Sequence, residues 1–126
     1  RTNMLSLARS LWSMPPDLGA AIVRTILESD TLRADWRDEL DAMRSRLNGL
    51  RAALAATHPR LSAIADQRGM FAMLPLTPEA VAALREEHGI YMAGNGRINI
   101  AGLRAETVPV FAQALRPHLE ALSGHS

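Results

Sequence analysis

The longest regular pattern in the chain is TLRADWRDELDAMRSRLNGLRAALA, residues 31–55. Its large apolar side chains recur every three or four residues, at Leu32, Trp36, Leu40, Met43, Leu47, Leu50 and Leu54. This spacing places them on one face of an α-helix of about 25 residues. The opposite face carries the charged residues Arg33, Asp35, Arg37, Asp38, Arg44, Arg46 and Arg51. Ser29-Asp30-Thr31 supplies N-cap residues and His58-Pro59 ends the pattern, so the sequence predicts one long amphipathic helix.

Two shorter helices are predicted upstream of the long one. Apolar residues between positions 4 and 12 have helical spacing. Ser13-Met14-Pro15-Pro16 breaks this pattern, because neither proline can continue a helix. A second helix begins near Asp17 and carries an apolar stripe that ends at Leu27.

The second half of the chain alternates between short apolar runs and helical patterns. Met70–Leu74 is a short apolar run that predicts a buried strand. Thr77-Pro78-Glu79 has the threonine and proline that open a helix, and Gly89 is a natural C-terminal stop. A final helix extends from about Ala105 to Leu122, where Pro117 should kink it or end its regular part.

Two further strands are predicted on either side of Gly94-Asn95-Gly96. Ile90–Ala93 and Arg97–Ala101 flank this three-residue loop, and its two glycines suit a hairpin. The resulting fold class is α/β, an α+β-like small domain in which the long helix and further helices pack on a small three-stranded sheet. We expect residues 1–126 to form a single domain. Its long helix is suited to packing against a structure outside this chain.

Composition excludes several classes of function. The net charge is +1, so no global field attracts nucleic acid or anionic lipid. There is no cysteine for a disulfide or a thiolate metal site, and no run of about 18 apolar residues that would span a membrane. All 14 basic residues other than histidine are arginine. Without a lysine the chain has neither a P-loop nor an amine to which pyridoxal phosphate can attach.

Arg97 is the strongest candidate for a binding residue. It lies in Gly96-Arg97-Ile98-Asn99-Ile100-Ala101-Gly102, where strand alternation turns Ile98 and Ile100 towards the core and Arg97 and Asn99 away from it. The flanking glycines leave room for a ligand, and a guanidinium held on a strand can bind a carboxylate through two parallel hydrogen bonds. The alternative is a solvated surface arginine in a hairpin.

The other polar residues give weaker signals. Arg9 lies on the first helix near the proline break, where a helix-surface charge is the alternative role. The other twelve arginines are expected on solvated faces or in ion pairs. The four histidines are scattered without metal-ligand spacing, so no metal site is assigned. Ser13 has no His/Asp context that would activate it as a nucleophile.

Three groups of segments carry a family resemblance. They are Arg9 to Pro16 with Gly19-Ala20 and Thr25-Ile26-Leu27; Leu32-Arg33 to Met43-Arg44 with Gly69-Met70-Phe71 and Leu76-Thr77-Pro78-Glu79; and Leu84 to Tyr91 leading into Gly96 to Gly102. In this order they resemble the C-terminal portion of class I pyridoxal-phosphate-dependent aminotransferases of the aspartate/aromatic group. The resemblance extends from about residue 5 to residue 122, and its last segment is the most specific.

The resemblance implies roles for three residues. The arginine of the Gly-Arg-Ile-Asn-Ile-Ala-Gly segment binds the substrate α-carboxylate in this family, which implies that role for Arg97. Arg9 is implied to reach the partner subunit's site and to meet the distal carboxylate of dicarboxylic substrates. Phe71 is implied to line the site near the substrate. Met14 departs from the family pattern, because many members have asparagine there, and this bears on the orientation of Arg9.

The resemblance also implies what surrounds the chain. Family members are homodimers of two-domain subunits that use pyridoxal phosphate to exchange an amino group between amino acids and 2-oxo acids. Their coenzyme lysine and phosphate-binding residues lie upstream of the matching portion. We therefore expect the C-terminal small domain, with adjoining helices, of a longer cytoplasmic aminotransferase for aromatic and dicarboxylic amino acids. The chain alone is expected to be inactive, with no catalytic or coenzyme-binding residue of its own.

Two other classes of function remain open at this point. An autonomous helical interaction module would use the long amphipathic helix to bind a partner helix. Such a module would not need the glycine-flanked strand pair. A nucleic-acid binder is disfavoured, because 13 acidic residues almost balance the arginines.

Overall fold

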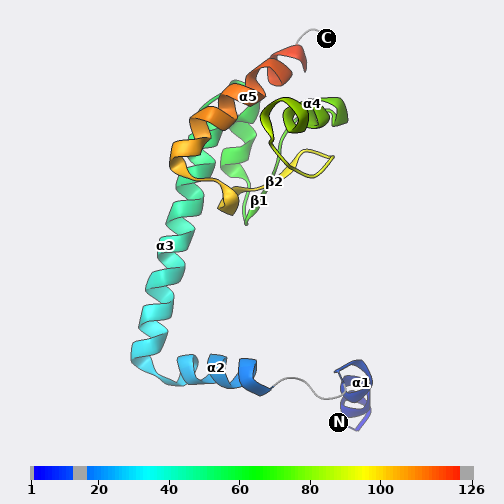
Figure 1. The fold of residues 1–126 in the computed structure, drawn as a ribbon. Coiled ribbons are helices and arrows are strands. Elements are labelled where there is room, and N and C mark those ends of the chain that lie inside the picture. The colour runs from blue at the N-terminus through cyan, green and yellow to red at the C-terminus, as the bar shows by residue number, and fades with distance from the viewer. Residues whose placement is uncertain (1, 13–16, 123–126) are drawn as a thin grey trace. The chain divides into compact units, whose positions relative to one another are not determined.

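The computed structural model describes residues 2–12 and 17–122, which belong to two units with a boundary between Ala42 and Met43 (Figure 1). The first unit contains α1 (Thr2–Trp12), α2 (Asp17–Glu28) and the first part of α3 (Asp30–Ala55). None of the side chains described in 2–11 and 17–42 is buried. All three helices predicted for this part of the chain are present. The predicted break at Ser13-Met14-Pro15-Pro16 lies outside the described residues.

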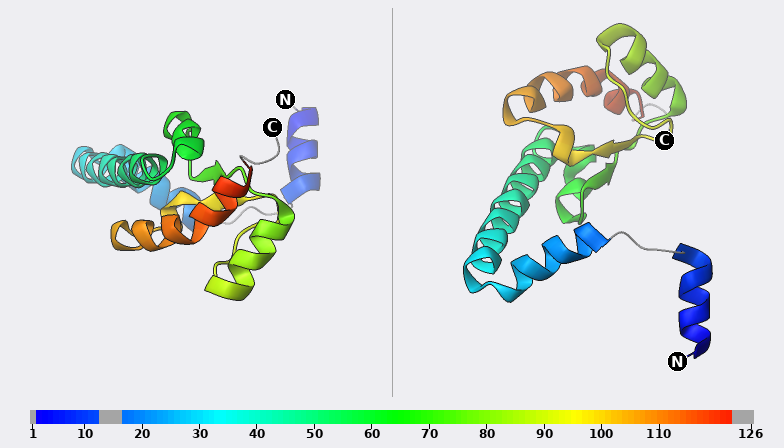
Figure 2. Two further views of the ribbon diagram at one scale, coloured as in Figure 1. Left: turned by 90° about the horizontal axis from the view of Figure 1, so that it is seen from above. Right: turned by 60° about the horizontal axis from the view of Figure 1, so that its bottom comes forward.

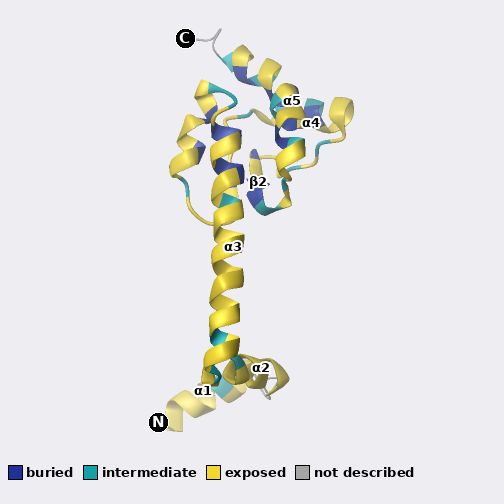
Figure 3. Cartoon of the chain, turned by 90° about the vertical axis from the view of Figure 1, so that its left-hand side faces the viewer, coloured by how far each residue is buried: buried dark blue, intermediate teal, exposed yellow. Residues whose placement is uncertain are grey.

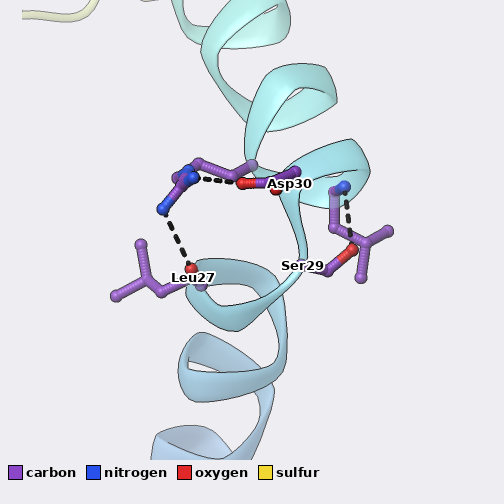
Figure 4. A network of polar contacts seen from close by, with 5 residues as sticks. Leu27, Ser29 and Asp30 are labelled. Carbon is purple, nitrogen blue, oxygen red and sulfur yellow. Dashed lines mark hydrogen bonds and ion pairs between the residues drawn. The ribbon is translucent and has the colours of Figure 1, made fainter.

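The start of α3 is fixed by local hydrogen bonds (Figure 4). The Ser29 hydroxyl oxygen accepts a hydrogen bond from the Leu32 N–H at 3.4 Å. Arg33 forms an ion pair with Asp30 and donates to the Leu27 carbonyl at 3.4 Å, so its side chain ties the end of α2 to the first turn of α3. This confirms that the Ser29-Asp30-Thr31 cluster begins the long helix.

The second unit gathers the remaining elements around one core (Figures 1 and 2). After the end of α3 they are η1 (Pro59–Asp66), β1 (Phe71–Met73), α4 (Pro78–His88), β2 (Arg97–Asn99), η2 (Ile100–Gly102), η3 (Ala105–Thr107) and α5 (Val108–Ala121). The fully buried side chains come from α3, η1, α4, η2 and α5: Leu54, Leu61, Ile64, Leu84, Ile100, Leu115 and Leu119. The short 3-10 helices were not predicted, and η3 takes the first three residues assigned to the final helix.

The apolar stripe of α3 is buried only at its C-terminal end (Figure 3). Leu50 and Leu54 are 5% and 0% exposed and belong to the core of the second unit. Four stripe residues nearer the N-terminus of α3 are between 42% and 51% exposed: Leu32, Trp36, Leu40 and Met43. The periodic pattern thus identifies the helix and its apolar face, but only part of that face is covered by the described residues.

Both ends of α4 follow the sequence prediction. The Thr77 hydroxyl accepts a hydrogen bond from the Ala80 N–H at 3.2 Å, and Pro78 occupies the first helical position. Gly89 ends the helix in the left-handed region at φ 64° and donates to the Arg85 carbonyl. The Ile90 N–H then bonds to the Leu84 carbonyl at 3.1 Å, which satisfies a second carbonyl of the last turn.

The sheet has two strands among the described residues, so the prediction of a third is wrong. β1 and β2 pair antiparallel, with Ala72 opposite Ile98. Residues 90–93 form no strand. Their backbone contributes one hydrogen bond to β2, from the Ala93 N–H to the Arg97 carbonyl at 3.3 Å. The Arg97 N–H bonds to the side-chain oxygen of Asn95, and the Ala93 carbonyl accepts the Gly96 N–H, so these two groups do not bond to each other.

α5 remains helical through Pro117 to Ala121, so the proline does not end it. Within the part of the chain that the structure describes, no helix combines the length and apolar character needed to cross a bilayer.

Candidate functional site

One face of the two-stranded sheet is left open. The strand register and alternation place Phe71, Met73, Arg97 and Asn99 on the same face, and all four are exposed. We call this set the outer face. On the opposite face Ala72 and Ile98 point into the core and are 2% and 9% exposed. The predicted orientation of Arg97 away from the core is therefore confirmed.

Arg97 and Phe71 meet on the outer face. The Arg97 Cζ atom lies 5.0 Å from the centroid of the Phe71 ring, which is the geometry of a cation–π contact. Residues offset by two positions across an antiparallel pair are within reach when one side chain is long, as arginine is. No carboxylate among the described residues pairs with this guanidinium. Its edge donors are thus available to an incoming anion.

The backbone that carries Arg97 is fixed at both ends. Asn95 accepts the Arg97 N–H at 3.2 Å, and Asn99 accepts the Ala101 N–H at 3.0 Å. Gly96 has φ 79°, and a Cβ added there would lie 2.7 Å from the Leu74 carbonyl oxygen. Only glycine fits this close approach of the turn to the end of β1. The strand therefore presents Arg97 from a well-defined position.

A hollow of about 1150 Å³ lies beside β2. Arg97 and Asn99 are among its lining residues, with Tyr91 and Met92 from the preceding loop and Val110 from α5. Its lining is mainly apolar, and Tyr91 and Val110 are 81% and 68% exposed. An anion bound by Arg97 would thus lie next to space that accepts apolar groups.

Arg9 belongs to the first unit, where it is exposed in the last turn of α1. The outer face belongs to the second unit. Of the three residues singled out in the sequence, Arg97 and Phe71 are brought together by β1 and β2 within one unit.

Arg51 departs from the expected solvated arginines. It is 3% exposed, and its guanidinium donates to the carbonyls of Ile64, Gly69 and Phe71. Arg46 on the same helix donates to the Ala101 carbonyl at 3.0 Å. Arg51 lies four residues after Leu47 and three before Leu54, which places it at the border of the apolar stripe. This position indicates burial. The assignment of Arg51 to the charged face of the helix missed this signal.

Glu79, in the first turn of α4, has a shifted pKa. A hydrogen bond from its own backbone N–H and one with the Thr77 hydroxyl lower the pKa of Glu79 below its usual value. Charged-group hydrogen bonds of this kind favour the ionised carboxylate, as does the positive end of a helix dipole. The side chain is fully exposed, so this carboxylate belongs to helix capping.

Known proteins are similar to this chain in sequence and fold. Residues 1–115 match the family model described as aminotransferase class I and II. A tyrosine aminotransferase of Rhizobium meliloti is 56% identical over 108 residues, covering 82% of this chain and 28% of that protein. The aspartate aminotransferase of Escherichia coli is 38% identical over 120 residues, covering 90% and 30%. A solved aromatic amino acid aminotransferase with 3-indolepropionic acid superposes with a TM-score of 0.84 at 45% identity, covering 91% of this chain and 31% of that one. The chain thus spans less than a third of each of these relatives.

Proposed function

Since the chain belongs to the class I and II aminotransferase family, we propose that it is the C-terminal small domain, with adjoining helices, of a longer aminotransferase. The proposed enzyme transfers amino groups between aromatic or dicarboxylic amino acids and 2-oxo acids. The relatives named for tyrosine, aspartate and aromatic amino acids support this substrate class. The half-exposed stripe of Leu32, Trp36, Leu40 and Met43 is the surface that we expect to contact the remainder of the enzyme.

The pairing of Arg97 with Phe71 is the observation that carries this proposal. Arg97 binds the substrate α-carboxylate through two parallel hydrogen bonds from the edge of its guanidinium. The Phe71 ring, 5.0 Å from the Arg97 Cζ, covers one face of that group and restricts where its edge points. Phe71 is half exposed, so its ring is also available to line the site beside the substrate.

A second arginine accounts for dicarboxylic substrates. Arg9 reaches the partner subunit's site in the proposed homodimer and binds the distal carboxylate of aspartate or glutamate. Arg9 is exposed, and α1 itself contains no carboxylate that could pair with it, so its guanidinium is available for this role. Met14 lies outside the described residues. We propose that methionine at this position alters the orientation of the Arg9 side chain.

The coenzyme is proposed to be held by the remainder of the enzyme. Bound pyridoxal phosphate would supply the electron sink for amino transfer. The residues of this chain do not fit its attachment, because there is no lysine. The contribution of this chain is to bind and orient the substrate, and alone it is inactive.

The test compares arginine variants in the full-length enzyme. Two charge-assisted hydrogen bonds to a carboxylate are worth about 1.5–3 kcal/mol, and 3 kcal/mol is roughly a 150-fold loss of kcat/KM. Arg97→Ala should lose that much for an aromatic and a dicarboxylic substrate alike, because both carry the α-carboxylate. Arg97→Lys keeps the charge but loses the fork, so it should also be strongly impaired. Arg9→Ala should impair aspartate and glutamate more than phenylalanine or tyrosine.

Arg85→Ala, on the exposed side of α4, is the matched control and should leave kcat/KM unchanged. If Arg97→Ala stays within about threefold of the parent on both substrates, Arg97 is a surface charge and the site assignment is wrong.

A further inference from the structure

β1 makes backbone hydrogen bonds to β2 along one edge only. The Met70 carbonyl accepts from the Ile100 N–H at 2.8 Å, and the Leu74 N–H donates to the Gly96 carbonyl at 3.0 Å. Backbone groups of successive residues in a strand point to opposite edges. The groups of residues 69, 71 and 73 therefore point away from β2, where no third strand lies among the described residues.

Two side chains bond to this second edge. Arg51 donates to the Gly69 carbonyl and, at 3.4 Å, to the Phe71 carbonyl, while its other terminal nitrogen donates to the Ile64 carbonyl at 3.4 Å. The Gln67 side-chain oxygen accepts the Met73 N–H at 3.3 Å. Arg51 and Gln67 thus satisfy three backbone groups on this edge: the Gly69 and Phe71 carbonyls and the Met73 N–H.

The burial of Arg51 makes this arrangement rigid. Arginine is rarely buried unless its donors are paired, and here the guanidinium donates to three backbone carbonyls. The described part of the chain leaves no buried side-chain nitrogen or oxygen without a partner. Because the Phe71 carbonyl shares the Arg51 Nη2 donor with the Gly69 carbonyl, a shift of the Phe71 backbone would cost the buried guanidinium one of its three carbonyl contacts.

We propose that Arg51 is a positioning residue for the substrate carboxylate, acting through Phe71. Arg51 holds the Phe71 carbonyl at the edge of β1, and the Phe71 ring lies against the Arg97 guanidinium on the outer face. A buried cation thereby sets the direction of the arginine that binds substrate, without touching substrate itself. The inference rests on the proposed role of Arg97.

The test measures KM and kcat separately in the full-length enzyme. Arg51→Met keeps the bulk of the side chain and removes the donors, so KM should rise about tenfold for aromatic and dicarboxylic substrates, with kcat changed less than about threefold. Arg51→Lys keeps one charged donor group and should rescue part of this loss. Leu119→Ala is the control, because it opens the same core from α5 and leaves the hydrogen-bonding groups of Arg51 and β1 in place. Loss of folded enzyme in that control should lower apparent kcat and leave KM unchanged.

A double-mutant comparison separates this proposal from the role of Arg97. Once Arg97→Lys has removed the forked contact, adding Arg51→Met should raise KM no further. If Arg97→Lys leaves KM and kcat/KM unchanged, the proposed role of Arg97 fails. If Arg97→Lys is impaired but Arg51→Met leaves KM unchanged, or raises it equally in both backgrounds, only the Arg51 proposal is overturned. If Arg51→Met does not fold, KM is measured in Arg51→Lys and Gln67→Ala instead. An unchanged KM in both of these variants overturns the Arg51 proposal.

Discussion

Replacing Gly96 by alanine should destabilise the second unit more than the same change at Gly89 or Gly94. Gly96 combines a positive φ of 79° with a position at which an added Cβ would lie 2.7 Å from the Leu74 carbonyl oxygen. Ordinary contacts begin at 3.4 Å, so the backbone of Leu74 would have to move by about 0.7 Å. That motion acts directly on the Leu74 N–H bond to the Gly96 carbonyl, which is 3.0 Å long.

The expected magnitude follows from two costs. An alanine held in the left-handed region costs about 1–2 kcal/mol, and loss of one backbone hydrogen bond costs about 0.5–1.5 kcal/mol. Gly96→Ala should therefore lower the free energy of unfolding by about 1.5–3.5 kcal/mol. Gly89→Ala has positive φ but open space around the added Cβ, so about 1 kcal/mol is expected. Gly94→Ala has neither constraint and should lie within about 0.5 kcal/mol of the parent.

Urea unfolding of the chain, followed by far-ultraviolet circular dichroism, measures this series. With a slope of about 1.5–2 kcal/mol per molar urea, Gly96→Ala should shift the midpoint down by roughly 1 M or more. Amide exchange at Leu74 and Ile100 should accelerate in that variant, because both amides bond across the β1–β2 pair. If Gly96→Ala is no more destabilising than Gly89→Ala, the register of the two strands is wrong.

Three further outcomes are expected. Thr77→Ala should remove the cap of α4 at a cost of about 1 kcal/mol in unfolding free energy. The same change should move the pKa of Glu79 part of the way back towards 4.5 in an NMR titration. Because the folded-state pKa is depressed, the stabilisation from Glu79 exists above its unfolded pKa and is lost as pH falls through the folded value. A pKa of Glu79 unchanged by the substitution would refute the hydroxyl contribution. Leu54→Ala should lower the free energy of unfolding of the chain by about 2–5 kcal/mol. Leu40→Ala should lower it by less than about 1 kcal/mol in the chain and by more in the full-length enzyme. Equal costs of Leu40→Ala in both proteins would argue against a contact between the α3 stripe and the remainder of the enzyme. With pyridoxal phosphate added, the chain alone should show no transaminase turnover, and borohydride should trap no coenzyme on an internal residue.

The helices could be predicted because their signals are local. The periodic pattern predicts a helix over residues 31–55, and α3 spans Asp30–Ala55. Ser29, Thr77 and Gly89 act on hydrogen bonds within a few residues of themselves, and such bonds can be inferred without knowledge of the tertiary fold.

The errors concern contacts between distant segments. Residues 90–93 have the apolar character of a strand, but they lie beside the edge of β2 at which the Asn95 side-chain oxygen accepts the Arg97 N–H. Periodicity assigns Arg51 to the charged face, because it does not reveal that carbonyls from residues 64–71 converge on this side chain. The outward direction of Arg97 follows from strand alternation, whereas its contact with Phe71 depends on a register that only the structure shows.

The side-chain hydrogen bonds on the second edge of β1 also bear on how the protein behaves when it is concentrated or newly made. A sheet edge with free backbone groups is a template on which another chain can add a strand, and this is a common start of aggregation. Here Arg51 and Gln67 bond to the Gly69 and Phe71 carbonyls and the Met73 N–H on the edge of β1 that faces away from β2, so an added strand would have to displace these hydrogen bonds before it could pair along that edge. Self-association of the chain by strand addition at β1 is therefore disfavoured, and Arg51→Met would remove that protection together with the hydrogen bonds.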